Sequence, residues 1–206
     1  PPRSTLFPYT TLFRSMPMLK RFLDQRCTVI DYERITDDEG KRLVFFGRYA
    51  GMAGMIETLR ALGLRWQRRG FSTPLQQIQP AFEYASSTEA REHLQTLGRL
   101  LAQQGLPAAL TPLVIGITGY GQVSSGAQEM LAGLPVIELS PAQLTAMTAA
   151  RNDVIYKVIF AEQDMVEPKE SRIAFSLPEY YSRPQLYRSR FAQFLPHLTV
   201  MVNAIY

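Results

Sequence analysis

The sequence predicts an α/β protein with a doubly wound parallel sheet, and three observations lead to this fold class. From residue 113 onward, short apolar runs typical of buried strands alternate with segments of helical spacing. A Gly-x-Gly turn stands between the first of these runs and the helix that follows it. The alternation continues almost to the end of the chain, without an internal repeat or a low-complexity tract. Strands joined by helices in this way lie parallel, because each crossover returns the chain to the same end of the sheet.

The first elements of the chain are short. Residues 16–25 have the apolar spacing of a helix, and residues 27–33 and 43–47 are apolar runs of strand length. The polar segment 36–41, which contains Asp-Asp-Glu-Gly, is expected to form a turn between these two strands.

A longer helix is expected to begin at Gly47 and to end near Gly63, because its apolar residues fall on one face. Its first turns contain three small residues, Gly51, Ala53 and Gly54. Each glycine costs about 1 kcal/mol relative to alanine inside a helix. We therefore expect another backbone to approach this helix closely.

The next helix is expected to begin at the capping box Ser86–Glu89 and to end at Gly105. The elements expected after it are a strand at 113–118, a helix after the glycine turn, a strand at 136–139, a helix capped by Ser140, a strand at 154–161, a helix at 184–194 and a strand at 199–203.

The turn Gly119-Tyr120-Gly121 carries most of the functional information. It follows the apolar run 113–118 and precedes a segment of helical pattern. A dinucleotide-binding half uses this arrangement, because glycines let the backbone approach the pyrophosphate and the helix N-terminus attracts its charge. The sequence therefore predicts a Rossmann-type domain that binds NAD or NADP.

This turn departs from the Gly-x-Gly-x-x-Gly pattern at the third glycine. Ser124 takes that place, and a glycine follows two residues later at Gly126. Serine is small enough to let helix and strand approach, and its hydroxyl can bind phosphate or cap the helix. An ordinary tight turn between a strand and a helix is the alternative interpretation.

Two later strand ends supply further candidates. An acidic side chain at Glu138 can accept hydrogen bonds from the adenosine ribose and disfavour a 2′-phosphate, whereas Ser140 at the same place would tolerate NADP. Asn203 either contacts the cofactor or is an amide bonded to the backbone, and Glu162 and Asp164 are interpreted as solvated loop residues. The candidate cofactor-binding residues are Gly119, Tyr120, Gly121, Gln122, Val123, Ser124, Gly126, Glu138 and Asn203.

Composition narrows the function class. The single cysteine, Cys27, predicts neither a disulfide framework nor a metal site, and no apolar stretch is long enough to span a membrane.

Residues 5–15 (TLFPYTTLFRS) look like a translated sequencing adapter, so residues 1–15 are expected to be a disordered artefact. Without Arg3 and Arg14 the formal charge falls from +4 to +2, which argues against nucleic-acid binding.

Three blocks, at residues 30–65, 119–141 and 183–206, together resemble the lysine-ketoglutarate reductase family, also called saccharopine dehydrogenase (lysine-forming), within the alanine dehydrogenase and transhydrogenase-like group. The resemblance covers nearly all of residues 16–206. It implies an oxidoreductase that joins the ε-amine of L-lysine to the keto carbon of 2-oxoglutarate. The imine is reduced by NADPH or NADH to saccharopine, or the reverse reaction runs.

The resemblance also implies a domain organisation. Residues 16–46 would be the end of an N-terminal α/β catalytic domain, residues 47–66 an interdomain helix, and residues 67–206 a C-terminally truncated NAD(P)-binding domain. The family's catalytic lysine and histidine precede the segment that matches residue 16, so no catalytic residue is assigned and the fragment is expected to be inactive. We expect a cytoplasmic protein, or a mitochondrial one in a eukaryote. The alternatives are an amino-acid or opine-type dehydrogenase with another substrate, and a non-catalytic NAD(P)-binding module.

Overall fold

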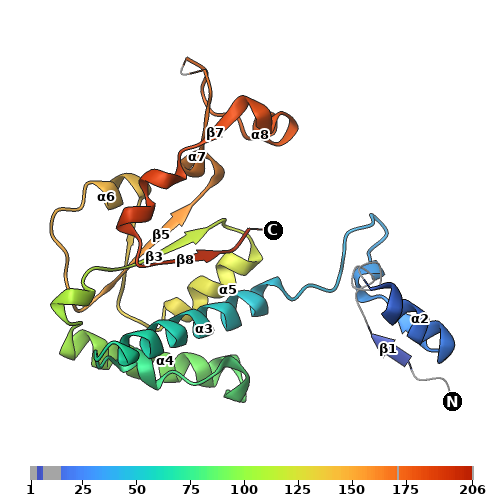
Figure 1. Cartoon of the computed structure of the whole chain (residues 1–206), viewed down its shortest axis with the longest axis horizontal. Helices are drawn as coiled ribbons and strands as arrows, with labels where there is room; N and C mark the ends of the chain where they lie inside the picture. Colours follow the sequence, from blue (N-terminus) through green and yellow to red (C-terminus); the bar gives the residue numbers. More distant parts are fainter. Residues whose placement is uncertain (1–3, 7–14, 171, 206) are drawn as a thin grey trace. The chain divides into compact units, whose positions relative to one another are not determined.

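The computed structural model describes residues 4–6, 15–170 and 172–205. The chain divides into two compact units, and the division falls between Phe46 and Gly47 (Figure 1). In the first unit, helix α2 spans Met16–Asp24, as its apolar spacing predicts. Strand β1 (Ser4–Leu6) pairs in parallel with β2 (Thr28–Ile30), and the 3-10 turn η1 (Tyr32–Arg34) follows. Of the segment expected to be an artefact, residues 1–3 and 7–14 lie outside the described residues.

The strand expected at 43–47 is wrong. Residues 43–46 have no regular structure, and a helix begins at residue 47. Leu43, Phe45 and Phe46 are more than half exposed. An apolar run becomes a strand only where a neighbouring strand pairs with it, and in this described segment the pairing is a single bridge between Thr36 and Arg42.

A four-stranded parallel sheet forms the centre of the second unit, which confirms the predicted α/β, Rossmann-like fold. The spatial order of its strands is β4-β5-β3-β8 (Figure 1). All six residues of the central strand β3 are buried, and each of them pairs with a residue of β5. The strand bounds are Leu113–Thr118 for β3, Val136–Leu139 for β4, Ile155–Phe160 for β5 and Val200–Asn203 for β8.

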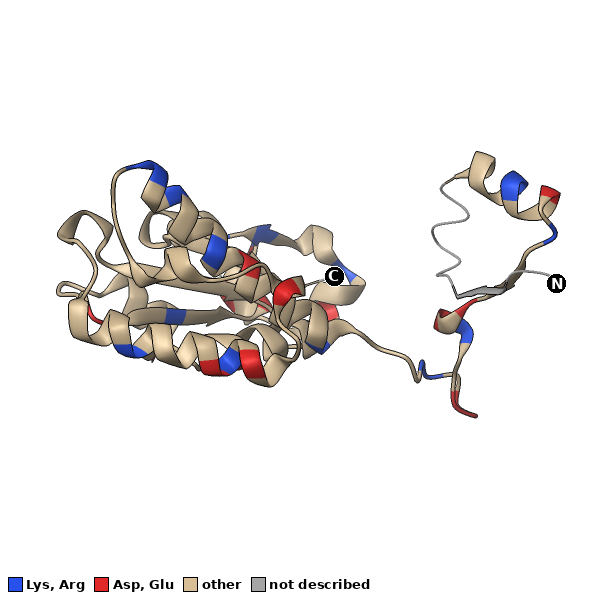
Figure 2. Cartoon of the chain, turned by 90° about the horizontal axis from the view of Figure 1, so that it is seen from below, with Lys and Arg blue, Asp and Glu red and all other residues tan. Residues whose placement is uncertain are grey.

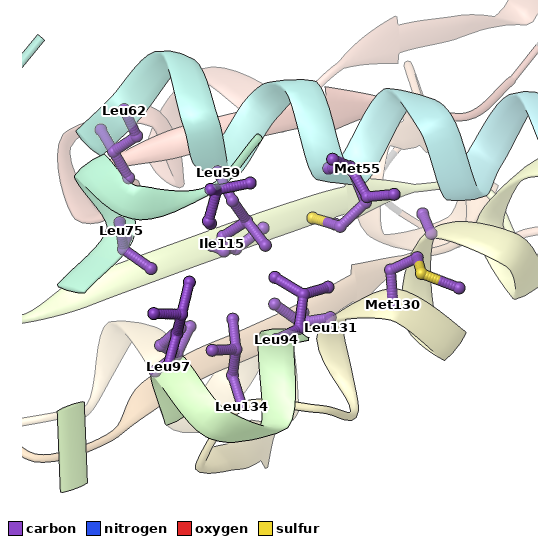
Figure 3. Close-up of a cluster of buried hydrophobic side chains, with 14 of the residues drawn as sticks. Met55, Leu59, Leu62, Leu75, Leu94, Leu97, Ile115, Met130, Leu131 and Leu134 are labelled. Atoms are coloured by element: carbon purple, nitrogen blue, oxygen red, sulfur yellow. The ribbon is translucent and has the colours of Figure 1, made fainter. Parts of the chain in front are cut away.

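Three helices cover one face of this sheet (Figure 1). Figure 3 shows the core beneath them, in which Met55, Leu94 and Met130 from the helices belong to the same buried cluster as Ile115 of β3. On the opposite face, a second apolar cluster is formed by Phe160 and other side chains from the sheet, the short helix α6 and the segment before β8. The helices are α3 (Gly47–Arg68), α4 (Ser87–Gln104), α5 (Gln122–Leu131) and α6 (Pro141–Thr145), with 3-10 turns η2 (Pro74–Gln77), η3 (Ala81–Glu83) and η4 (Ala108–Leu110).

Helix α3 does not end at Gly63 as expected. Gly63 is buried inside the helix, because the backbone of Leu75 lies where a side chain would project. The helix continues to Arg68, and Gly70, with φ of +85°, takes the left-handed conformation just beyond its end. The glycine at position 63 therefore serves packing rather than termination.

The serine caps predicted for α4 and α6 are present, but the Glu89 carboxylate of the capping box predicted for α4 accepts from the Ala85 amide and not from the Ser86 amide. The Ser86 hydroxyl accepts a hydrogen bond from the Glu89 amide at 3.1 Å, and Gly105 follows α4 with φ of +68°. Ser140 and Gln143 form a reciprocal capping box at the start of α6. These local signals are readable from sequence because each cap satisfies its own helix end.

The helix expected at 184–194 is wrong. This segment instead contains β7, which pairs antiparallel with β6, flanked by 3-10 turns. Its apolar residues are buried in two different places, since Tyr187 packs against Phe175 and Tyr180 while Phe194 packs against Phe160. The elements are α7 (Glu162–Met165), β6 (Val166–Pro168), α8 (Leu177–Ser182), η5 (Pro184–Leu186), β7 (Tyr187–Ser189), η6 (Phe191–Gln193) and η7 (Leu195–His197).

Candidate functional site

A pocket of about 530 Å³ lies at the carboxyl ends of β3, β5 and β8. Residues 119–123 line it from the glycine turn and the start of α5. The other lining residues come in pairs from three segments: Glu162 and Met165, Tyr180 and Tyr181, and Ala204 and Ile205. In open α/β sheets, ligands bind in the crevice outside the carboxyl ends of the strands. Another pocket, of about 350 Å³, lies beside Pro112 and Pro196, away from the glycine turn.

The first glycine of the turn is required by the protein itself. Gly119 follows β3 with φ of +87°, and its amide donates a hydrogen bond of 2.9 Å to the carbonyl of Phe160. A side chain at this position would also lie 2.5 Å from Cγ2 of Ile205. Both the left-handed backbone and the neighbouring chain therefore demand glycine here.

The second glycine of the turn, Gly121, differs from the first because neither its backbone conformation nor a neighbouring atom requires glycine. Gly121 has φ of −79° and ψ of −166°, a conformation open to any residue, and a side chain built on it meets nothing within 4 Å. No contact within the described protein explains a glycine at this position. Gly121 is one of the residues that line the pocket, and the space beside it is open.

Gly121 is also the N-cap of α5, and the first helical hydrogen bond runs from the Ser125 amide to its carbonyl at 2.9 Å. The amides of residues 122–124 precede that bond and have no acceptor within the helix. Together with the helix dipole, such amides attract an anionic group. The geometry of the turn therefore suits the pyrophosphate of a dinucleotide.

Ser124 and Gly126 are buried and do not line the pocket. The Ser124 hydroxyl accepts a hydrogen bond of 3.1 Å from Nε2 of Gln128. Gly126 faces α3, where an added side chain would lie 1.8 Å from the carbonyl oxygen of Arg48. These two positions fix α5 against its surroundings.

The close approach expected along α3 is confirmed at Gly51 and is wrong at Gly54. A side chain at Gly51 would lie 1.9 Å from the Val123 carbonyl oxygen, whereas one at Gly54 would meet nothing within 4 Å. Glu129 strengthens the contact between α3 and α5, because its carboxylate pairs with Arg48 at 2.6 Å and with Arg91 of α4 at 3.1 Å. Figure 2 shows that basic and acidic residues are interspersed along the ribbon of the larger unit.

Glu138 lies outside the pocket. It belongs to β4, and β5 stands between β4 and the strand that carries the glycine turn. Its side chain is 60% exposed and forms an ion pair of 2.6 Å with Lys157 of β5, which also donates to Gln128 of α5 at 2.9 Å. The Glu138 carboxylate is therefore paired with Lys157, and β5 separates its strand from the strand that carries the turn.

Asn203 lies at the end of β8, opposite Thr118 at the end of β3. The Thr118 hydroxyl donates to Oδ1 of Asn203 at 2.8 Å, and the Ile205 amide donates to the same atom at 3.4 Å. Asn203 is exposed, and its carbonyl oxygen ties the end of β8 to β3 beside the pocket. Ala204 and Ile205, which follow it, reach the pocket directly.

Glu162 was interpreted as a solvated loop residue, yet it lines the pocket. The Tyr181 hydroxyl donates a hydrogen bond of 2.6 Å to its Oε1. This bond lowers the pKa of Glu162 below its ordinary value and raises the pKa of Tyr181 to about 12. The Glu162 charge also raises the pKa of Tyr120 on the glycine turn. Asp164, in contrast, accepts from the Ala161 amide at 2.9 Å and caps α7.

Within the described ranges, no group of three or more histidine, cysteine, aspartate or glutamate residues is placed to hold a metal ion. None of the helices in the same residues is long and apolar enough to cross a membrane.

No protein-family model matches the chain. Its curated relatives include the alpha-aminoadipic semialdehyde synthase of Arabidopsis thaliana, which is 37% identical over 205 residues, covering 93% of this chain and 19% of the relative. The mitochondrial alpha-aminoadipic semialdehyde synthase of Rattus norvegicus is 32% identical over 194 residues, covering 93% of this chain and 21% of the relative. The saccharopine dehydrogenase [NAD(+), L-lysine-forming] of Candida glabrata is 30% identical over 121 residues, covering 57% of this chain and 30% of the relative. The chain spans about a fifth of the length of the two semialdehyde synthases.

Proposed function

Because the chain is homologous over 93% of its residues to alpha-aminoadipic semialdehyde synthases, we propose that it is the nucleotide-binding segment of an oxidoreductase of lysine metabolism. The proposed reaction of the longer protein is the condensation of L-lysine with 2-oxoglutarate and reduction of the imine by NADH or NADPH to saccharopine, or the reverse. The name of the Candida glabrata relative supports a saccharopine substrate and a nicotinamide cofactor. The proposed location is the cytoplasm, or the mitochondrion in a eukaryote, as the name of the rat relative states for that protein.

The observation that carries the proposal is the opening at Gly121. A pocket-lining glycine beside open space, at the N-terminus of a ten-residue helix that follows a buried parallel strand, suits the close approach of a pyrophosphate. Residues 119–123 would hold this group through backbone amides. Ser124 and Gly126 would keep α5 in place, and Asn203 would hold the end of β8 beside the cofactor.

The pocket residues of this chain bind and orient rather than catalyse in this proposal. A nicotinamide cofactor supplies the hydride when it is bound. We assign proton transfer to no residue of this chain, and we expect it to bind nucleotide without turnover when it is tested alone.

Calorimetric titration of the full 206-residue chain with NADH and with NADPH tests the proposal. We expect binding of at least one nucleotide, and loss of that binding in Gly121→Asp, because the new carboxylate would fill the opening and repel the pyrophosphate. Gly54→Asp is the matched control, since it makes the same substitution at an open glycine outside the pocket.

Two outcomes would contradict the proposal. One is a folded wild-type chain that binds neither nucleotide. The other is a Gly121→Asp variant that binds as tightly as the Gly54→Asp control, since the glycine turn would then have no part in binding. Circular dichroism of each variant separates loss of binding from loss of the fold.

A further inference from the structure

The last turns of α3 carry an excess of positive charge. Between residues 58 and 82 the sequence contains four arginines and neither aspartate nor glutamate. Arg60 forms an ion pair of 3.4 Å with Glu57. The other three side chains have no ion pair or hydrogen bond among the described residues, and they belong to Arg65, Arg68 and Arg69. Like charges four residues apart on a helix destabilise it, so this spacing does not serve the helix itself.

The end of α3 is capped without these side chains. The carbonyl of Trp66 accepts hydrogen bonds from the amides of Arg69 and Phe71. The carbonyl of Gln67 accepts another from the amide of Gly70. Arginine side chains often bond the last carbonyls of a helix, but here backbone amides do so. The arginines at this helix end are therefore available to another group.

Arg65 and Arg69 line a pocket of about 260 Å³ at the amino ends of two neighbouring strands. Pro112, which directly precedes β3, and Thr199, which directly precedes β8, line it as well. These strands are parallel, so the glycine turn lies at the opposite end of the sheet. A strand of six residues spans roughly 20 Å, which separates an anion bound here from the proposed cofactor site.

The charged groups of this pocket are all positive, since none of the described residues that line it is acidic. Its hydroxyl groups are already bonded within the protein. The Thr199 hydroxyl accepts from the Val114 amide and donates to the Pro112 carbonyl, both at 3.0 Å. The Thr111 hydroxyl donates to the Pro107 carbonyl at 3.2 Å. The two guanidinium groups are therefore the uncommitted charged donors of the pocket.

We propose that Arg65 and Arg69 bind the phosphate group of a small ligand in this pocket, at a site separate from the proposed cofactor site. Residues four apart on a helix have Cβ atoms roughly 5–6 Å from each other, so both guanidinium groups can reach one anion. The planar guanidinium group matches phosphate oxygens with two parallel hydrogen bonds. Two positive charges without a carboxylate suit a group whose charge approaches −2, as that of phosphate does at neutral pH.

Trp66 reports on this site, because it lines the pocket and is the single tryptophan of the chain. Titration of the full chain with inorganic phosphate at constant ionic strength should change its fluorescence in a saturable way. Calorimetry of the same titration should give the same dissociation constant. Acetate, which carries a single negative charge, should bind more weakly than phosphate.

Three variants locate the bound anion. Arg65→Gln and Arg69→Gln should each raise the phosphate dissociation constant by about tenfold, because a hydrogen bond to a charged group is lost. Arg68→Gln is the matched control, since it removes the same charge from the same helix end but lies outside this pocket. It should leave the dissociation constant unaltered. Circular dichroism shows that each variant is folded.

Three results would overturn the inference. The first is a folded wild type that binds no phosphate by either measurement. The second is equal weakening by Arg68→Gln and by the two pocket variants, which would indicate diffuse attraction to a basic helix end. The third is loss of phosphate binding in Gly121→Asp, which would place the anion at the glycine turn. Titration with NADH and NADPH decides the proposed nucleotide-binding function separately.

Discussion

Replacing Gly126 by alanine tests the contact between α3 and α5. The new methyl group would lie 1.8 Å from the carbonyl oxygen of Arg48 and 2.7 Å from its carbonyl carbon, whereas real contacts of this kind essentially never fall below 3.0 Å. Both obstructing atoms belong to the backbone, so no side-chain rotation relieves the clash. To bring this contact to 3.0 Å, the two helices must move apart by more than an ångström. The core between them then loses packing contacts.

The expected cost follows from two opposing terms. An overpacked core costs roughly 1–3 kcal/mol, and a clash with the backbone belongs at the upper end of that range. Alanine returns about 1 kcal/mol because it favours the helix more than glycine does. We therefore expect Gly126→Ala to lower the free energy of unfolding by about 2 kcal/mol.

Urea unfolding followed by tryptophan fluorescence measures this change. Trp66 is the single tryptophan of the chain, and it is buried in α3 of the larger unit. Gly54→Ala on the same helix is the control, because a side chain there meets nothing within 4 Å. It should raise stability by up to about 1 kcal/mol. Equal shifts in the two variants, or an unchanged Gly126→Ala, would refute the reasoning.

Two further predictions concern the hydrogen bond between Tyr181 and Glu162. Titration of the phenols by ultraviolet absorbance should show one group with a pKa of about 12, and Glu162→Gln should return that group towards its ordinary value near 10; a wild-type titration without such a group would contradict the bond. Because this bond lowers the pKa of Glu162, its carboxylate should stay ionised into more acidic solution than an ordinary glutamate allows, and it should be protonated only as the pH falls through that lowered value. Tyr181→Phe removes the main cause of the lowering and should raise the pKa of Glu162. NMR titration of the Glu162 carboxyl group across the acidic range would show no difference between the two proteins if the bond has no such effect.

Much of the second unit could be predicted from sequence because its signals are local. Strand β3 is an uninterrupted apolar run with all six residues buried, and the bounds of β3 and β4 agree with the prediction. Ser86 and Ser140 cap helices through bonds that span three residues. The glycine turn was placed correctly for the same reason.

The remaining features depend on partners distant in the chain. Whether β4 or β5 lies next to β3 is decided by packing across the whole sheet, so the position of Glu162 beside the turn could not be derived from its place in the sequence. The run 43–47 has strand composition, but no strand among the described residues pairs with it. In the segment 184–194, Tyr187 and Phe194 have helical spacing but are buried in separate clusters.

The two glycines of the contact between α3 and α5 place a particular limit on sequence change. A clash with a side chain can be relieved when that neighbour mutates to something smaller. A methyl group at Gly51 or Gly126 would instead strike a main-chain carbonyl, of Val123 or Arg48, which every amino acid possesses. A substitution at the partner position leaves that carbonyl in place, so the need for glycine depends on how closely the two backbones approach and not on which side chain faces it.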